Sequence, residues 1–442
     1  MYSNKKILIL GMARSGYEAA KYLSRLNNEI IVTDAKEQDI EKVKELESLG
    51  VKVIITSNQI ELVTSDLDYM IKNPGIKYTN ECVLKAHELG IKVINELELA
   101  YYFLNKKAKV IGVTGSNGKT TTVTLIYNIL KENGLNAYLG GNIGTPLISF
   151  VDDIKENDIL VLEISDHQLC DMYDFKTDIS VLTNIYSEVH IDFHDSFERY
   201  QMMKKRIFNH HTNSDIAIIN KNNQYSIDVT NDIASKKLYF SLDNGDSYVS
   251  DNYIYYNSEM VINLNDIKLK GEHNLENIMA TILVVKQFDV PNEVIQKVLK
   301  AFKGVEHRIE YVRSLNGVDY YNDSKSTNNK ATETALKAFK TPVILIMGGY
   351  NRNLPFDELG RYMQNVKEII CYGETKEQIS EFASNNNIDC TVLNNLKEAT
   401  LKANSDAING DTVLLSPACA SWDQYKCFED RGNEFKDIVN SL

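Results

Sequence analysis

Short apolar runs alternate with segments of helical periodicity along nearly the whole chain. Residues 1–97 contain five such runs, each rich in β-branched residues: KKILIL, NEIIVTD, VKVII, LDYMIK and IKVIN. This alternation is typical of a parallel sheet whose strands are joined by crossover helices. The pattern therefore predicts a first α/β domain over residues 1–97.

The same rhythm returns twice further along the chain. Residues 98–303 predict a central domain with a mostly parallel sheet, from the runs KVIGVTG, DILVLEIS, TDISVLTN and DIAIIN. Between Lys236 and Lys270 the pattern changes to LYFSL, YIYY and MVINL, separated by turn residues, which favours a small antiparallel addition. Residues 304–442 predict a third α/β domain, from PVILIMGG, EIICYG, CTVLN and TVLLSPA.

Length and composition agree with a multidomain globular protein. A chain of 442 residues is too long for one core. Its N-terminal apolar run ends in a glycine loop, which predicts a first strand and not a signal peptide. No apolar stretch approaches the roughly 20 residues that cross a bilayer, and the six cysteines form no C-x-x-C pair, which indicates reduced thiols in the cytoplasm.

The formal net charge of −13 argues against general nucleic-acid binding, which needs a basic face. An anionic ligand would therefore need local loop amides, a few cationic side chains and metal ions.

The stretch VTGSNGKTTT (113–122) follows the apolar run KVIGV and is the strongest candidate for a ligand site. Strict P-loop spacing requires glycine where this chain has Val113. Even so, Gly115, Gly118, Lys119 and Thr120 would place backbone amides, an ammonium and a magnesium-binding hydroxyl at one helix N-terminus. Nucleotide binding is favoured over a plain polar turn, and the reaction stays open.

The N-terminal GMARSG (11–16) also follows a predicted strand, and Asp34 ends the next one. These residues match the dinucleotide fingerprint only loosely. A tight turn for helix packing fits equally well, and a nicotinamide cofactor is one of several phosphate-bearing ligands that could use the loop.

Carboxylates and histidines gather between Leu160 and Lys205. Glu163 ends a strand and is expected to reach the magnesium of the phosphate loop. The segment HIDFH supplies His190, Asp192 and His194. These three could form a hydrogen-bonded turn, an isolated zinc site or, more economically, a site for a second magnesium at the same nucleotide.

Two further polar segments follow apolar strands near the C-terminus and suggest binding loops: YNDSKSTNN (321–329) and LLSPACASWDQYKCFEDRG (414–432), the latter with the chain's only tryptophan.

Together these motifs resemble the Mur ligases of bacterial cell-wall synthesis over nearly the whole chain. The matching segments are VTGSNGKTTT, GGNIGTP (140–146), GEHNLEN (271–277), EHRIE (306–310), NDSKSTN (322–328) and SPACASWDQYKCFEDRGNEF (416–435). The first is shared with folylpolyglutamate synthases, and the loop form T-G-x-N-G-K-T of that superfamily accounts for Val113. The last two, with GMARSG and NPGI (73–76), resemble the D-glutamate-adding branch.

The resemblance implies a Rossmann-like N-terminal domain for the UDP end of the substrate, a P-loop-type ATPase domain and a Rossmann-like C-terminal domain for the amino acid. It implies ATP-dependent addition of D-glutamate to UDP-N-acetylmuramoyl-L-alanine through an acyl phosphate and a tetrahedral intermediate, releasing ADP and phosphate. Two Mg²⁺ ions are implied. A cytoplasmic monomer without nucleic-acid or membrane partners is expected.

Roles follow from the matching positions. The residues expected at ATP are Gly115, Ser116, Asn117, Gly118, Lys119, Thr120, Thr121, Asn274 and Arg308. Those expected at the UDP-linked acceptor are Gly11, Arg14, Ser15, Asp34, Gly75 and Asn142. Those expected at D-glutamate are Thr327, Arg352, Ser421, Trp422 and Phe428. The expected metal ligands are Thr120, Glu163, His190 and Lys204, the last as a carbamate. The expected catalytic residues are Lys119, Glu163, His190, Lys204, Asp323 and Lys325.

Two departures from the family pattern flank the expected metal site. The usual Ser-Ser-Phe-Gln-Leu is SDHQL here, with Asp166 and His167, and SEVHID has Val189 where an aspartate is expected. Three alternatives stay open: another Mur ligase or a folylpolyglutamate synthase, a nicotinamide-dependent oxidoreductase suggested by the N-terminal glycine loop, and a nucleotide-binding protein that has lost catalysis, suggested by these two departures.

Overall fold

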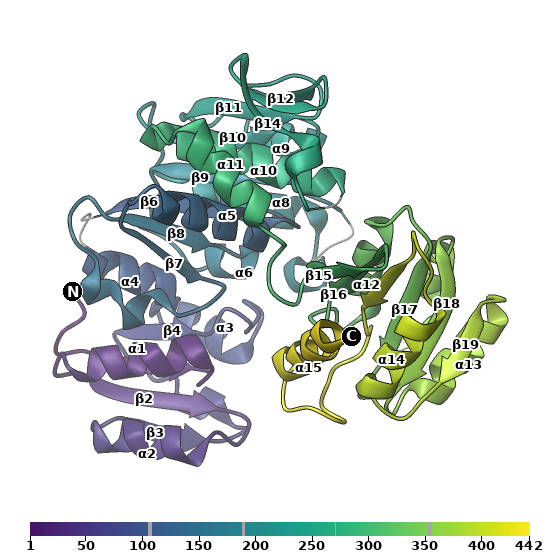
Figure 1. Ribbon diagram of the computed structural model, residues 1–442. Helices are drawn as coiled ribbons and strands as arrows, with labels where there is room; N and C mark the ends of the chain where they lie inside the picture. Colours follow the sequence, from purple (N-terminus) through teal and green to yellow (C-terminus); the bar gives the residue numbers. More distant parts are fainter. Residues whose placement is uncertain (105–107, 188–190, 270, 352–354) are drawn as a thin grey trace. The chain divides into compact units, whose positions relative to one another are not determined.

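In the computed structural model, the described residues form three β-sheets, with five, nine and six strands (Figure 1). It describes the chain except for residues 105–107, 188–190, 270 and 352–354, and the side chains of residues 191 and 192. The first two sheets lie in one compact unit, residues 1–263 with 276–298, and the third lies in a second unit, residues 264–275 with 299–442. The predicted α/β architecture is confirmed, whereas the boundaries after residues 97 and 303 stay a prediction.

The first sheet is parallel throughout and has the order β3-β2-β1-β4-β5. Its strands are β1 (Lys6–Leu10), β2 (Glu29–Asp34), β3 (Lys52–Ile55), β4 (Tyr69–Lys72) and β5 (Lys92–Ile94). Its helices are α1 (Arg14–Ser24), α2 (Ile40–Ser48) and α3 (Glu81–Glu88). The order of strand addition reverses between the central strands β1 and β4, since β2 and β3 lie on one side of β1 and β4 and β5 on the other. A ligand of such a sheet binds beyond the carboxyl ends of these two strands.

The second sheet has the order β14-β13-β12-β11-β10-β9-β6-β8-β7. Its strands are β6 (Lys109–Thr114), β7 (Ala137–Gly141), β8 (Ile159–Glu163), β9 (Ile179–Leu182), β10 (Ile216–Asn220), β11 (Lys236–Ser241), β12 (Ser247–Ser250), β13 (Tyr253–Tyr256) and β14 (Glu259–Asn263). The helices of this part of the chain are α4 (Glu96–Leu104), α5 (Lys119–Glu132), α6 (Asp166–Leu169), α7 (Ile191–His194), α8 (Phe197–Lys205), α9 (Gln224–Val229), α10 (Glu272–Val285) and α11 (Asn292–Ala301).

The predicted antiparallel addition is confirmed for β12, β13 and β14. It is wrong for LYFSL, because β11 runs parallel to β10, with Ile216 opposite Lys236. The connection between these two strands contains α9. A helical crossover of this kind returns the chain to the same end of the sheet, which makes the next strand parallel.

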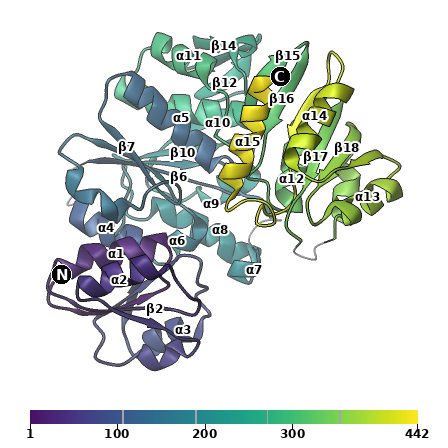
Figure 2. The same cartoon turned by 60° about the horizontal axis from the view of Figure 1, so that its bottom comes forward.

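The third sheet has the order β15-β16-β20-β17-β18-β19 and is parallel except for the β15–β16 hairpin. Its strands are β15 (Glu310–Leu315), β16 (Val318–Asn322), β17 (Val343–Gly348), β18 (Val366–Tyr372), β19 (Asp389–Val392) and β20 (Thr412–Leu415). The apolar residues of α12 (Asn329–Lys337) and α13 (Lys376–Asn385) fill one face of the sheet. Those of α14 (Leu396–Asp406) and α15 (Phe428–Ser441) fill the other (Figure 2).

Among the described helices, none has the length and apolar character that a membrane crossing requires.

A carboxyl group lies deep inside the first unit, at the start of α4. Glu96 is 3% exposed, and its Oε1 accepts a hydrogen bond of 2.6 Å from the backbone N–H of Ile148. Burial raises the pKa of Glu96 to about 7. The folded chain therefore binds this proton more tightly than the unfolded chain does.

This difference predicts a pH-dependent contribution to stability. The pKa of Glu96 rises from 4.5 to about 7 on folding, so the free energy of unfolding should fall by about 3 kcal/mol as pH increases through that window. In E96Q an amide oxygen can still accept from Ile148 without ionising. We expect E96Q to be more stable than the wild type at pH 8 by urea unfolding, and the two to converge near pH 4. If the free energies of unfolding of E96Q and the wild type differed by the same amount at pH 8 and pH 4, this account would be contradicted.

Candidate active site

The segment after β6 forms a sharp turn into α5, as the sequence predicts. Gly115 and Gly118 have φ values of 149° and 85°, which side-chain-bearing residues rarely adopt. A Cβ atom on Gly115 would lie 1.9 Å from the Thr183 hydroxyl, and one on Gly118 would lie 2.1 Å from Oδ1 of Asn277. Glycine is therefore required at both positions by conformation and by space.

Neighbouring residues hold this loop in place. Asn184 accepts hydrogen bonds from the backbone N–H of Ser116, at 2.8 Å, and of Asn117, at 2.9 Å. The Ser116 hydroxyl bonds to the Tyr200 hydroxyl at 2.7 Å. Neither Asn184 nor Tyr200 belongs to a sequence motif that would have predicted this contact. Asn184 could have been found as the polar residue that follows β9, the neighbour of β6 in the sheet.

Lys119 is the first residue of α5, and its ammonium bends back over the loop. Nζ donates to the carbonyl oxygens of Gly115, at 2.8 Å, and Ser116, at 3.0 Å. The first backbone N–H groups of a helix have no partner within it, and the helix dipole adds positive potential there. Lys119 and the start of α5 together form an anion-binding site suited to phosphate.

A hydroxyl, a carboxylate and an amide converge beside the loop. Glu163 is 2% exposed; its Oε2 accepts from the Thr120 hydroxyl at 2.7 Å, and its Oε1 accepts from the Asn142 side-chain amide at 2.8 Å. The strand order β6-β8-β7 causes this meeting, since the three residues follow or end neighbouring strands. The oxygens of Thr120 and Glu163 are of the type that Mg²⁺ prefers, so this pair could hold the ion.

A buried ionic network lies next to these residues. Asp166 begins α6, which Ser165 caps through a capping box. Oδ1 of Asp166 accepts from Nζ of Lys204 at 2.9 Å, Oδ2 lies 2.7 Å from Nε2 of His194, and Lys204 also donates to the Thr114 hydroxyl at 3.3 Å. Burial acts to raise the pKa of Asp166, but Lys204 and His194 lower it well below its usual range. Burial lowers the pKa of Lys204, and Asp166 opposes that effect.

Asp166, His167 and His194 also form a potential metal-binding cluster, with ligand atoms within 4.8 Å of one another. Thus His194 of the HIDFH segment meets the altered SDHQL motif. His190 lies outside the described residues, as does the side chain of Asp192, so their metal roles stay predictions. In the sequence, Asp166 stands out only as a departure from the family pattern, because nothing in the chain order pairs it with Lys204.

The glycine loop after β1 packs against the loop after β4. A Cβ atom on Gly11 would lie 2.8 Å from Cβ of Asn73. The Asn73 side chain donates to the Ser15 hydroxyl at 3.4 Å and accepts from the Gly75 backbone at 3.0 Å. Three of the residues expected at the acceptor, Gly11, Ser15 and Gly75, therefore lie together at the carboxyl edge of the first sheet.

Asp34 and Arg14 make contacts within the protein. The Asp34 carboxylate accepts from the backbone N–H of Met12 at 2.9 Å. Arg14 donates to the Gly144 carbonyl oxygen at 2.5 Å, which joins the N-terminal loop to the GGNIGTP segment that also carries Asn142. Their contacts to a substrate stay predictions.

The NDSK segment follows β16 in the second unit. Asp323 is buried and accepts from the Ser416 hydroxyl at 2.7 Å and from the Ile309 backbone at 3.2 Å. Burial raises its pKa to about 6. The carboxylate therefore fixes the loops after β16 and β20 to each other and to the turn before β15.

Several residues expected at D-glutamate lie on these loops. Nζ of Lys325 lies 5.7 Å from the centre of the Phe428 ring, and the Ser324 hydroxyl donates to the Phe428 carbonyl oxygen at 2.8 Å. Thr327 donates through its backbone to the Lys325 carbonyl oxygen at 2.9 Å. Ser421, 2% exposed, lies on the neighbouring loop after β20.

The remaining expected residues are less closely tied to a site. Trp422 is 60% exposed, and its ring lies 5.8 Å from that of Tyr350. Arg352 lies outside the described residues. Asn274 belongs to α10 and Arg308 to the turn before β15, and their roles at ATP stay predictions.

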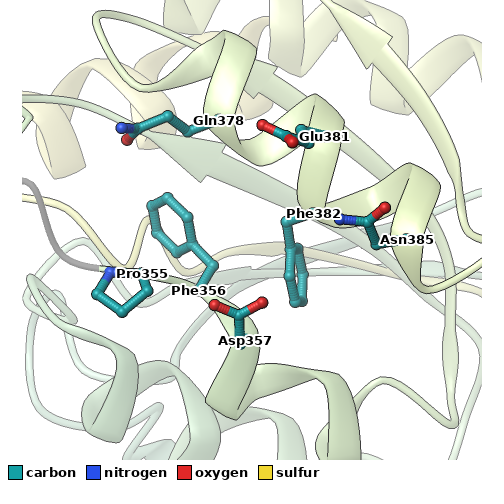
Figure 3. A pocket seen from close by; sticks show the side chains of 7 residues that line it. All are labelled: Pro355, Phe356, Asp357, Gln378, Glu381, Phe382 and Asn385. Atoms are coloured by element: carbon teal, nitrogen blue, oxygen red, sulfur yellow. The ribbon is translucent and has the colours of Figure 1, made fainter.

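A pocket of about 360 Å³ lies elsewhere in the second unit. Its side chains come from α13 and from the segment that starts at Pro355, with the Phe356 and Phe382 rings between the carboxylates of Asp357 and Glu381 (Figure 3). Of the expected active-site residues that the structure describes, none lines it.

A phosphate-binding loop, with a hydroxyl and a carboxylate placed for magnesium, defines a nucleotide-binding protein of the α/β class. Family models match nearly the whole chain: the "Mur ligase MurD-like, N-terminal domain" at residues 5–95, the "Mur ligase middle domain" at 113–285 and the "Mur ligase, glutamate ligase domain" at 307–419.

The chain belongs to the Mur ligase family. It is 42% identical over 448 residues to the UDP-N-acetylmuramoylalanine–D-glutamate ligase of Geobacillus sp. strain WCH70, covering 100% of this chain and 98% of the relative. It is 40% identical over 447 residues to that of Bacillus cereus strain G9842, with the same coverage.

Solved structures support the fold. The chain resembles UDP-N-acetylmuramate–alanine ligase from Thermotoga maritima with a TM-score of 0.60 at 16% identity, over 99% of each chain. It resembles MurF from Acinetobacter baumannii with a TM-score of 0.61 at 14% identity, over 99% of this chain and 91% of the other. The three-domain Mur ligase fold is thereby confirmed.

The buried pair of Asp166 and Lys204 predicts a large effect of removing one partner. In bicarbonate-free buffer, where Lys204 is unmodified and pairs with Asp166 as an ammonium, D166N would leave that charge buried without its anion, and we expect the free energy of unfolding to fall by about 3 kcal/mol. The adjacent Lys205 forms a comparable ion pair with Asp232 at the surface. D232N is thus a matched control for which we expect little change. Urea unfolding measures the stability of both variants. An equal loss in the free energy of unfolding for D166N and D232N would contradict the importance of burial.

Proposed function

We propose that this chain is an ATP-dependent ligase that joins D-glutamate to UDP-N-acetylmuramoyl-L-alanine, a step of peptidoglycan precursor synthesis, with release of ADP and phosphate. The observation that carries the proposal is the convergence of Thr120 and Asn142 on Glu163 beside the phosphate loop. Asn142, which is expected to contact the acceptor, and Thr120, which is expected to bind Mg²⁺ at ATP, form hydrogen bonds to the same carboxylate. The full-length relatives bear the matching name.

The chemistry explains why such a site is needed. A carboxylate is a poor electrophile because its charge is delocalised and oxide is a poor leaving group. When the carboxylate oxygen of the acceptor attacks the γ-phosphorus of ATP, ADP leaves and an acyl phosphate forms. The amine of D-glutamate then attacks the acyl carbon, loses a proton, and the tetrahedral intermediate expels phosphate to leave an amide. Positioning and electrostatic stabilisation provide most of the catalysis of such steps.

The residues of the first unit would divide these tasks. Lys119 would exchange its loop carbonyl partners for the β- and γ-phosphates of ATP. Thr120 and Glu163 would hold Mg²⁺, which supplies charge neutralisation at the phosphates. Asn142, fixed by Glu163, would orient the muramoyl part of the acceptor. The UDP end would lie at the carboxyl edge of the first sheet, with Gly11, Arg14, Ser15, Asp34 and Gly75.

In the second unit, the loops after β16 and β20 would bind D-glutamate. Thr327, Ser421 and Phe428 would line its site, with Arg352 taking a carboxylate contact. The Lys325 ammonium would neutralise anionic groups nearby, and Asp323 would hold both loops in place. We expect the enzyme to act in the cytoplasm as a monomer.

The amino-acid preference tests the proposal directly. With ATP, Mg²⁺ and UDP-N-acetylmuramoyl-L-alanine, we expect ADP release to depend on D-glutamate and to be absent with L-alanine or a diamino acid. A coupled ADP assay with a panel of amino acids measures this. Turnover with L-alanine or a diamino acid, but not with D-glutamate, would assign the chain to another member of the family. Binding of all ligands without acyl-phosphate formation would indicate a protein that has lost catalysis.

We also propose that Lys204 carries a carbamate in the active enzyme and helps His190 to hold a second Mg²⁺. Carbamylation requires the neutral amine, which attacks CO₂ and releases a proton. The complete burial of Lys204 and its lowered pKa favour that form. The modification would convert a cation into a carboxylate-like metal ligand beside Asp166.

Carbon-13 spectroscopy tests this modification independently of activity. With ¹³C-bicarbonate, we expect one carbamate carbonyl signal in the wild type that is absent from K204A. We also expect K204A to lose ligase activity and to regain part of it with formate or acetate. A wild-type spectrum identical to that of K204A would show that Lys204 is unmodified.

A further inference from the structure

Lys72 is a fully buried cation at the end of β4, in the first unit. Its side chain is 0% exposed; Nζ lies 2.8 Å from the Asp171 carboxylate and donates to the Ile76 carbonyl oxygen at 2.7 Å. Asp171 lies two residues beyond α6 and is 4% exposed. A buried ammonium needs a counter-ion and hydrogen-bond acceptors, and Lys72 has both.

The bond to Ile76 closes the NPGI segment (73–76) into a loop. Lys72 directly precedes this segment and bonds to its last residue. Within the loop, the backbone N–H of Ile76 donates to the Asn73 carbonyl oxygen at 3.0 Å, and the Asn73 side chain donates to the Ser15 hydroxyl of the glycine loop after β1. The UDP end of the acceptor is expected at these two loops. Their shape therefore depends on a lysine that is closed off from solvent.

Asp171 connects the NPGI loop to α6, which begins beside the phosphate loop. The first residue of α6, Asp166, belongs to the buried ionic network next to that loop. Further along α6, the Gln168 carbonyl oxygen accepts from the side-chain amide of Asn95, which follows β5, at 2.5 Å. β4 and β5 are neighbouring strands. Their carboxyl ends thus hold α6 and the segment after it at two points, one of which is the pair of Lys72 and Asp171.

Lys72 is the main partner of Asp171. Burial raises the pKa of Asp171, and Lys72 opposes that effect more strongly than Arg206 or His87 does. Removing either member of the pair would leave the other buried without its main partner.

We propose that Lys72 and Asp171 are positioning residues for the acceptor. The pair fixes the NPGI loop to α6, so that the site for the UDP end keeps a constant distance from the phosphate loop and the acceptor carboxylate meets the γ-phosphate of ATP. Neither side chain touches a substrate. The inference rests on the proposed function for the identity of the acceptor.

The kinetic constants of two variants test this role. K72M removes the ammonium and keeps an unbranched side chain, and D171N removes the negative charge. We expect each variant to raise KM for UDP-N-acetylmuramoyl-L-alanine about tenfold, which corresponds to the loss of one interaction of a charged group. KM for ATP and KM for D-glutamate should stay nearly unchanged, because the loops that are expected to bind them do not contain the pair.

Asp215 provides a matched control. Like Asp171 it is 4% exposed, and it pairs with Lys176 at 2.9 Å. It precedes β10, however, at the amino end of the second sheet, whereas the phosphate loop follows the carboxyl end of β6. We expect D215N to lose stability to urea as D171N does, with all three KM values unchanged. An equal rise in KM for the acceptor in D171N and D215N, or no rise in K72M and D171N, would overturn the inference.

A double variant keeps the test decisive if the single variants do not fold. K72M/D171L removes both charges together, and apolar replacement of a buried ion pair is often neutral for stability. This variant still lacks the hydrogen bond to the Ile76 carbonyl oxygen. We therefore expect a folded protein with a raised KM for the acceptor, and a wild-type KM would overturn the inference.

Hydrogen exchange separates this inference from the proposed function. The backbone N–H groups of Asn73, Gly75 and Ile76 are all hydrogen-bonded. We expect them to exchange faster in K72M than in the wild type or in D215N, as measured by mass spectrometry of peptides that contain residues 73–76. If the wild type does not turn over the acceptor, the proposed function fails, and the exchange rates still decide whether the pair fixes this loop. Unchanged exchange in K72M would overturn the inference alone.

Discussion

A carboxylate removed from water must have hydrogen-bond donors or a cation beside it, and Glu163 shows how this constraint organises the first unit. It ends a buried strand, and its two oxygens bind donors that come from both sides along the sheet. The neighbouring strands must therefore end at the same level, with Thr120 and Asn142 at their carboxyl ends. This single side chain links the geometry of the phosphate loop to that of the GGNIGTP segment, which carries Asn142.

The same principle explains how an acidic protein can bind several anions. The chain carries a net charge of −13, so its surface does not attract phosphate or carboxylate. Positive charge is instead placed locally at the carboxyl edges of the sheets, where the Lys119 ammonium lies against backbone carbonyl oxygens and the Lys325 ammonium lies near the Phe428 ring. These cations are partly buried, so an arriving anion meets them in an environment of lower dielectric constant than water, where the attraction is stronger.

The sequence predicts most of the strands and the phosphate loop because these depend on local patterns. β-branched runs favour strands, and Gly115 and Gly118 favour a turn by their conformational freedom. The direction of β11 was predicted wrongly because it depends on the crossover through α9 and not on the LYFSL run itself. The pairing of Asp166 with Lys204 could not be predicted, since the two residues lie 38 positions apart and meet only in the folded chain.

The two glycines of the phosphate loop have a consequence for nucleotide affinity. Their missing side chains leave space that is filled from outside the loop, by Thr183 after β9 and by Asn277 of α10. The shape of the loop therefore depends on the packing of two residues from distant parts of the sequence. Substitutions of Thr183 and Asn277 should consequently alter the affinity for ATP, as substitutions of the residues that contact the nucleotide would.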